Sequence, residues 1–289
     1  SELFIMSGNG SDAHSEYDVT SDGGTGIISN QIDIYGNSKL QIRGGMGGSI
    51  LHNNSSSISG RDGKAGGTAV IATFVTINET IELDIKGGIG GDANHGGRGI
   101  DGLKGTDGVS VSGGRDGEEG NNGTNGGNGG RSGKGGYAFL IADYGSLIIS
   151  SSVTGIIEAG SIGAAGNGGN GGNGGNGGKG ARGIDSFSGS GGYGGVGGNA
   201  GNGGNGGNTY SSIPAIYGNS LTLMLNQIEI TNSNAGTPGV GGLAGLVGIG
   251  GYGGPNFCFI FCYGTDRSDD KAADGSPGSN GTTGLYNTP

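Results

Sequence analysis

The stretch from residue 163 to residue 208 reads GAAGNGGNGGNGGNGGKGARGIDSFSGSGGYGGVGGNAGNGGNGGN, and it decides the fold. Asparagine occupies every third position from Asn167 to Asn176, Lys179 continues the series, and two glycines separate each of these residues. A period of three matches neither an α-helix, with about 3.6 residues per turn, nor a strand, with a period of about 2. It matches a polyproline-II-type helix, which has about three residues per turn and here carries two edges without a Cβ. The sequence therefore predicts polyglycine-II helices that pack side by side.

Disorder and collagen are the alternatives to this interpretation. The chain has 79 glycines and 5 prolines among 289 residues, a composition that signals a flexible chain when no period is present. Here the period persists, and the residues at the third position change in character from segment to segment, which favours ordered helices. The single-glycine triplets in residues 96–108 and 275–284 are typical of collagen, but a collagen triple helix needs many more prolines.

The composition also limits the partners. The chain carries 14 Lys and Arg against 24 Asp and Glu, a net charge of −10, which disfavours nucleic-acid binding. No apolar run reaches the ~20 residues of a membrane span. No signal peptide begins at Ser1, as expected for a mature chain from which one has been removed. Helix-forming residues are scarce, so we expect an all-β fold with almost no α-helix.

An internal repeat predicts the strands. Residues 23–48 align with residues 66–91 without a gap, at an offset of 43 residues. Within the first copy, Ile32 and Ile34, and then Leu40 and Ile42, alternate with polar residues, as in half-buried strands. Two looser copies begin at residues 136 and 213 and lead into further glycine runs.

These copies predict one woven domain, residues 1–289, with a layered, solenoid-like sheet and a bundle of Gly-Gly-X helices. The aliphatic strands would hold the bundle together, because a net hydrogen bond of ~0.5–1.5 kcal/mol hardly offsets the ordering of a glycine. The expected β segments are about 25–43, 68–86, 137–159 and 213–232. The expected glycine-helix excursions are about 44–48, 87–136, 163–208 and 236–255, before a C-terminal strand and tail at 256–289.

The residues at the third position predict which helices are buried. Large apolar side chains recur every third residue in the last glycine run, at Val240, Leu243, Leu246, Ile249 and Tyr252. We expect this stripe to be buried against the sheet or in the centre of the bundle. We expect the asparagine runs to form outer helices, with side chains in water or capping neighbouring backbones.

Two apolar segments at the ends of the chain are candidate assembly sites. Leu3, Phe4, Ile5 and Met6 form a short strand near the N-terminus, and a second strand carries Phe257, Phe259, Phe261 and Tyr263. Both faces of the second strand are apolar, which is compatible with a core strand. Alternatively, either strand adds to the sheet of a second copy, in a head-to-tail contact that would build a homo-polymer.

Sites for catalysis or cofactors are sparse. His14, His52 and His95 lie in unrelated segments, and Cys258 and Cys262 are too few for a four-sulfur zinc site. In an extended strand these two cysteines lie too far apart for a disulfide, so they pair only if the segment turns or between subunits. Calcium is the one candidate cofactor, at Asp92 and in the acidic segments 114–119 and 265–270. No phosphate-binding loop or catalytic triad is present, so we expect a protein without enzymatic activity or any other cofactor.

The Gly-Gly-X runs and the β segments before them resemble the polyglycine-II sandwich of the tip adhesins on long tail fibres of T-even-type bacteriophages. That resemblance implies receptor-binding loops between glycine runs, here residues 181–190 and 208–218, which would meet a cell-surface glycan or protein. The asparagine-rich triplets are also similar to mycobacterial glycine-rich surface proteins, whose N-terminal domain is absent here. Arthropod glycine-rich antifreeze proteins share the helix type but lack such long aliphatic β segments.

Two functions follow as expectations. The first is a structural subunit of an extracellular filament or surface matrix, which the apolar strands at the ends of the chain favour. The second is a receptor-binding adhesin of a phage tail fibre or a bacterial surface, which should carry aromatic and charged residues on the loops between helices. Both functions place the protein outside the cell or on its surface.

Overall fold

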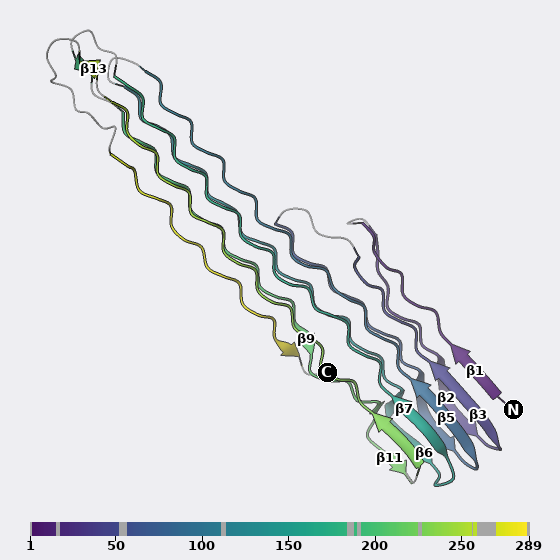
Figure 1. Cartoon of the computed structure of the whole chain (residues 1–289). Helices are drawn as coiled ribbons and strands as arrows, with labels where there is room; N and C mark the ends of the chain where they lie inside the picture. Colours follow the sequence, from purple (N-terminus) through teal and green to yellow (C-terminus); the bar gives the residue numbers. More distant parts are fainter. Residues whose placement is uncertain are drawn as a thin grey trace.

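The computed structural model describes residues 2–15, 18–51, 57–110, 114–183, 188–189, 192–224, 227–255, 257–258 and 270–287. Every regular element in these ranges is a strand, which confirms the prediction of an all-β fold without α-helix. The molecule is a rod, with the main sheets at one end and long extended glycine-rich segments along its length (Figure 1). The N-terminus lies at the sheet end, and the C-terminus lies beside the junction of sheets and segments.

The first sheet is parallel and has the order β1-β3-β5-β7-β12. Its strands are β1 (Glu2–Met6), β3 (Ser38–Arg43), β5 (Ile81–Lys86), β7 (Thr154–Glu158) and β12 (Gln227–Thr231). Leu40 pairs with Leu83 and Ile42 with Ile85, so the residues aligned by the 43-residue repeat are direct neighbours across the strands. The offset of the sequence repeat therefore equals the offset between paired residues of β3 and β5.

The second sheet is also parallel and has the order β10-β6-β4-β2, with β11 paired to the far end of β6. Its strands are β2 (Ile27–Ile34), β4 (Val70–Ile77), β6 (Phe139–Ile149), β10 (Ile216–Tyr217) and β11 (Leu221–Leu223). Two short pairs lie elsewhere: β8 (Ser188–Gly189) with β13 (Phe257–Cys258), and β9 (Thr209–Tyr210) with β14 (Tyr286–Asn287).

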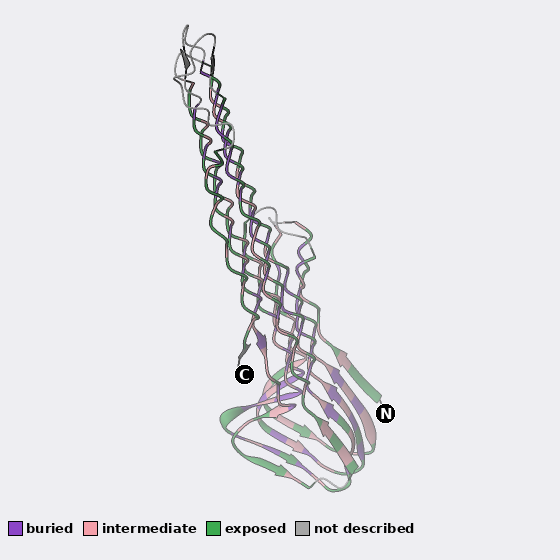
Figure 2. Ribbon diagram, turned by 60° about the vertical axis from the view of Figure 1, so that its left-hand side comes forward, coloured by how far each residue is buried: buried purple, intermediate pink, exposed green. Residues whose placement is uncertain are grey.

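The core lies between the two sheets. β2 and β3 follow one another in the chain but belong to different sheets, and Gly36, with φ of 98°, lies in the turn between them. Ile85 and Ile157 of the first sheet and Ile77 and Ile149 of the second are fully buried in one apolar cluster. Alternate residues of the strands therefore form the core that period-2 patterning predicts. Figure 2 shows buried positions in the strands and further buried positions along the glycine-rich segments.

The glycine-rich segments form two rows. The outgoing segments leave the sheets after β1, β3, β5, β7 and β12, and comprise residues 7–13, 44–51, 87–109, 160–181 and 236–255. The returning segments run in the opposite direction and comprise residues 19–26, 57–68, 115–136, 192–208 and 270–285. Backbone hydrogen bonds at every third residue join neighbours within a row and between rows, as from Gly171 N to Leu243 O (2.8 Å) and from Gly172 N to Thr124 O (2.8 Å).

Glycine is needed here for close approach and not for its backbone freedom. Among the described glycines only Gly36, Gly114 and Gly155 have positive φ. A Cβ placed on Gly172 would overlap the carbonyl of Ile100 in a neighbouring segment. The bare edge therefore lets two backbones come within hydrogen-bond distance.

The number of glycines in a triplet follows the number of neighbouring segments. In segment 115–136, Gly127 and Gly130 pack against the carbonyls of Ile58 and Arg61 in segment 57–68. Three residues before Gly127, where segment 57–68 begins, the same edge carries Thr124, which is exposed. Thr124 Oγ1 accepts the N–H of Ile100 at 2.6 Å and lies 2.8 Å from Ser57 Oγ, so a side chain replaces the close backbone contact at this level.

Segment 87–109 changes in the same way. Gly88 and Gly91 pack against the carbonyls of Gly45 and Gly48, while Ile100 and Leu103 occupy this edge farther from the sheets and are exposed. Single-glycine triplets therefore mark segments at the edge of the bundle, which explains them without a collagen triple helix.

Candidate assembly surfaces

A recurring two-bond contact joins segments of the same row. Asn167 Oδ1 accepts the N–H of Val240 at 2.9 Å, and the N–H of the next residue, Gly168, donates to the carbonyl of the same Val240 at 2.8 Å. An acceptor side chain and the following amide thus hold both backbone groups of one residue. We name this contact a clamp.

Clamps recur along both rows. In each, the acceptor side chain belongs to the earlier segment and the held residue to the next segment of that row. The acceptors of the outgoing row are Asn9, Asp12, Ser49, Asp92, His95, Asp101, Asp107, Asn167, Asn170, Asn173 and Asn176. Those of the returning row are Asp22, Asp62, Asp116, Asn122, Asn125, Asn128, Asn199, Asn202, Asn205 and Asn208.

The clamps confirm that asparagine side chains cap neighbouring backbones, but the asparagine runs are not outer helices. Segment 160–181 lies between segments 87–109 and 236–255 in its own row and bonds to two segments of the returning row, 115–136 and 192–208. Its two glycine edges are covered, and only its third position faces outwards.

The predicted burial of the apolar stripe is wrong. The exposed fractions are 61% for Val240, 62% for Leu243, 74% for Leu246, 52% for Ile249 and 50% for Tyr252. Packing in this bundle uses the glycine edges, so the side chain at the third position points outwards whether it is polar or apolar. Segment 236–255 is the last described segment of its row, and its side chains clamp nothing further.

The edge of the bundle beside this stripe is closed by side chains of the last returning segment. Asp274 Oδ1 accepts the N–H of Gly250 at 2.9 Å, and Asn280 Oδ1 accepts the N–H of Ala244 at 2.9 Å. The N–H groups of Gly250 and Ala244 are therefore already engaged and cannot donate to a further segment at these positions.

Strand β1 is an open sheet edge. Among the described strands it pairs only with β3, and Leu3, Phe4 and Met6 are 56%, 54% and 70% exposed. Ile5 is half-buried and packs on the core. At the opposite edge, β12 exposes Gln227 and Glu229, which alternate with half-buried Ile228 and Ile230.

The second predicted assembly strand is described only in part. Phe257 lies in β13, which pairs antiparallel with β8. Phe259, Phe261, Tyr263 and Cys262 lie outside the described residues, as do residues 184–187 and 190 of the first receptor loop that the phage resemblance implies.

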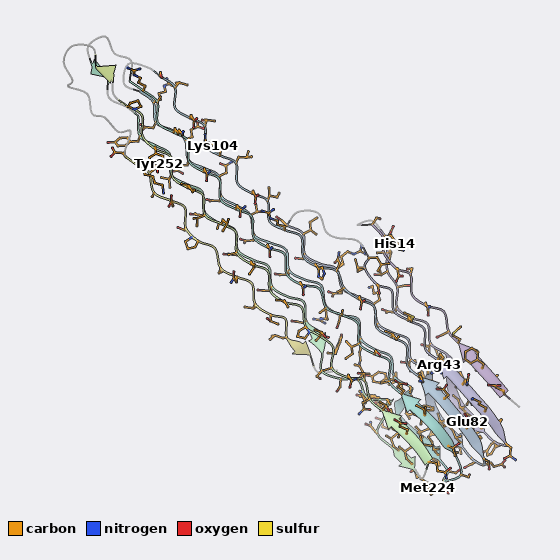
Figure 3. The ribbon with its side chains drawn as sticks, viewed as in Figure 1. His14, Arg43, Glu82, Lys104, Met224 and Tyr252 are labelled. Carbon is orange, nitrogen blue, oxygen red and sulfur yellow. The ribbon has the colours of Figure 1, made fainter. Side chains whose placement is uncertain are left out.

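Ion pairs cross the outer face of the first sheet beside β1. Lys39 and Glu82 lie 3.1 Å apart, and Lys86 and Glu158 lie 2.7 Å apart. Glu82 raises the pKa of Lys39 by hydrogen bonding and by its charge. Figure 3 labels Glu82, together with Arg43 of the neighbouring ion pair to Asp84. Because these pairs are partly exposed, they contribute little to stability, but they make the face polar next to the apolar β1.

The described residues contain no group of three or more His, Cys, Asp or Glu side chains that could hold a metal ion. Asp92 and Asp116, from two of the calcium candidates, are clamp acceptors, and residues 265–269 lie outside the described part. His95 Nδ1 is also a clamp acceptor, whereas His52 lies outside the described part. Within the described part, no helix is long and apolar enough to cross a membrane.

Comparison with known proteins assigns no family. No family model and no curated protein matches the sequence. A weak structural match is the springtail antifreeze protein from Granisotoma rainieri, a bundle of nine polyproline type II helices. It is 22% identical and the match covers 66% of this chain and 97% of that chain, but at a TM-score of 0.09 it carries no argument about fold or function.

Proposed function

We propose that the glycine-rich segments are polyglycine-II helices and that the two sheets form a layered, solenoid-like stack from which the helices extend. The three-residue spacing of the inter-segment hydrogen bonds supports this conformation, as does the absence of positive φ from the described glycines of the segments. Measuring φ and ψ in an experimental structure tests it.

We further propose that the protein is a structural subunit of an extracellular filament or surface matrix and assembles without covalent bonds. The observation that carries this proposal is the contrast between two kinds of edge. The glycine bundle ends on donors that Asp274 and Asn280 already cap, whereas β1 offers an unpaired strand edge beside exposed Leu3 and Phe4. Natural proteins usually blunt such edges with charges or bulges, so an apolar open edge favours an interface.

The partner that suits β1 best is β12 of a second copy. Both strands run parallel to β3, β5 and β7, so β1 of one copy would continue the parallel sheet of another. In the same register, Leu3 would lie beside Ile228 and Ile5 beside Ile230, which extends the apolar inner rows of the sheet. The contact joins two different surfaces and generates a filament unless it closes into a ring.

Electron microscopy and sedimentation of the purified protein test the assembly. We expect fibres from the parent chain and folded monomers from Phe4→Asp, which puts a charge into the new interface. Leu103→Asp is the matched control, because Leu103 is 73% exposed but lies on a glycine segment away from β1. Monomers of the parent chain at high concentration, or fibres that persist in Phe4→Asp, would contradict the proposal.

A receptor-binding adhesin is the second candidate. The rod shape favours it, because the long glycine-rich segments extend far from the sheets (Figure 1). Of the two loops that the resemblance to phage tail-fibre tip adhesins implies, the first begins at the far end of segment 160–181, whereas residues 208–218 contain β9 and β10 and lie near the sheets. An adhesin would appear as discrete particles that bind cells, and removal of β1 would leave that binding intact.

A further inference from the structure

Asn–Gly pairs are chemically fragile, because the unhindered amide nitrogen of glycine attacks the asparagine side chain. The sequence contains eleven such pairs. They begin at Asn9, Asn122, Asn125, Asn128, Asn167, Asn170, Asn173, Asn176, Asn202, Asn205 and Asn280.

Every one of these pairs is held at both reacting groups. In each, the asparagine Oδ1 accepts a backbone N–H of another segment. In each, the glycine N–H donates to a backbone carbonyl of that segment. The pair at Asn170 is an example: Leu243 N donates to Asn170 Oδ1 at 2.9 Å, and Gly171 N donates to Leu243 O at 2.8 Å.

The reaction needs both groups to be free. The glycine nitrogen loses its proton and bonds to the asparagine Cγ, and the side-chain nitrogen leaves as ammonia. Water then opens one of the two C–N bonds of the resulting succinimide, which gives aspartate or isoaspartate. A clamp keeps the N–H engaged as a donor and holds the side-chain amide towards the neighbouring segment, so ring closure requires the clamp to open first.

We propose that the clamps, and the similar pair of bonds at Asn280, protect the chain from deamidation, and that Asn280 and Asn9 are the first sites to be modified. The two bonds of the Asn280–Gly281 pair go to different residues, Ala244 and Gly242, and its segment is the last of the bundle. Asn9 lies in the short first outgoing segment. Segments at the edge of a row open at lower free energy than interior ones, so the bonds that hold these two pairs break more often.

The two products differ in their effect. Aspartate keeps an acceptor oxygen, and Asp62, Asp101 and Asp116 already serve as clamp acceptors. Isoaspartate lengthens the backbone by one carbon and breaks the period of three. Protection of the nine other pairs therefore preserves the hydrogen-bond register over the length of the bundle.

The first test compares native protein with protein unfolded in guanidinium chloride at the same pH and temperature. Mass spectrometry of peptides measures aspartate and isoaspartate at each pair over time. We expect similar rates at all pairs in the unfolded chain, and rates lower by about tenfold or more in the native protein at all pairs except Asn9 and Asn280. Native rates close to the unfolded rates at the interior pairs would overturn the proposal.

A second test opens one clamp alone. Leu243→Pro removes the N–H that holds Asn170, and its fixed φ near −65° suits a polyproline-II-type segment. The control, Leu243→Ala, keeps that N–H. We expect severalfold faster deamidation at Asn170 in Leu243→Pro only, with Asn173 unchanged in both variants. Equal rates at Asn170 in the two variants would show that general rigidity, and not the clamp, slows the reaction.

Discussion

Asn173 and Leu246 are joined by two hydrogen bonds: Leu246 N donates to Asn173 Oδ1 at 2.9 Å, and Leu246 O accepts the N–H of Gly174 at 2.8 Å. Asn173→Ala removes the first bond, so we expect a loss of about 0.5–1.5 kcal/mol of unfolding free energy. Asn173→Asp keeps an acceptor and should cost less. Chemical denaturation measures both, and an equal loss in the two variants would show that the side-chain bond adds nothing.

Leu246 itself should tolerate a charge. Its side chain is 74% exposed, so Leu246→Asp is expected to change the unfolding free energy by less than about 0.5 kcal/mol. Ile157→Ala is the contrasting change, because Ile157 is fully buried between the sheets and its loss should cost about 2–5 kcal/mol. A large loss in Leu246→Asp would restore the idea of a buried stripe.

The glycine edge predicts a position-dependent tolerance of alanine. Gly127→Ala puts a Cβ into the carbonyl of Ile58, which should cost about 1–3 kcal/mol or more as the segments separate. Thr124→Ala changes the same edge three residues earlier, where the side chain is exposed and only the hydrogen bonds of Oγ1 to Ile100 N and Ser57 Oγ are lost, so it should cost less, about 0.5–1.5 kcal/mol. Thermal unfolding of the two variants compares them, and similar melting temperatures would argue against packing by glycine edges.

Acid should weaken the contacts in which an aspartate side chain accepts a backbone N–H. The pKa of Asp107 lies below its ordinary value of 3.8, because Lys104 and then the amide of Lys179 hydrogen-bond to the carboxylate. Lys271 and the amide of Gly250 lower the pKa of Asp274 in the same way. A lowered pKa stabilises the folded state above pH 3.8, and this stabilisation is lost as the pH falls through the folded-state pKa.

The double variant Asp107→Asn with Asp274→Asn tests this dependence, because it keeps both acceptor oxygens and removes both charges. We expect its melting temperature to fall less than that of the parent between pH 5 and pH 2. Both carboxylates are exposed, so solvent screening keeps the difference small. Parallel curves for the two proteins would contradict the prediction.

The strands could be predicted from the sequence better than the bundle. Ile27 pairs with Val70 and Leu40 with Leu83, so residues that the repeat aligns at offset 43 are paired in the sheets. Paired residues have similar surroundings on the same face of a sheet, and the sequence repeats for that reason. The glycine excursion expected at residues 44–48 extends to residue 51, and segment 57–68 pairs beside it. Its triplets carry mostly one glycine, so a search for Gly-Gly-X does not detect it.

The candidate surfaces were harder to predict, for a physical reason. A large apolar residue usually indicates burial, but in this bundle the contact is made by atoms of the main chain, and Leu246 lies on the outside. The acceptor side chains at every third position could have predicted the clamps. Asp62, Asn122 and Asn167 each carry a side-chain oxygen that accepts a backbone N–H, and in each case the next residue supplies the donating N–H. The side on which each segment finds its neighbour depends on the order of the rows, which a local pattern does not contain.

The clamps also have a fixed order along the chain, which matters during synthesis. Asn9 acts on Met46, Asp92 on Ala164 and Asn167 on Val240, so the acceptor always precedes its target in the chain. During synthesis from the N-terminus, each newly made segment meets a finished one that already displays its oxygens. The bundle can therefore form in the order of synthesis, because each finished pair of outgoing and returning segments offers hydrogen-bond acceptors to the next pair.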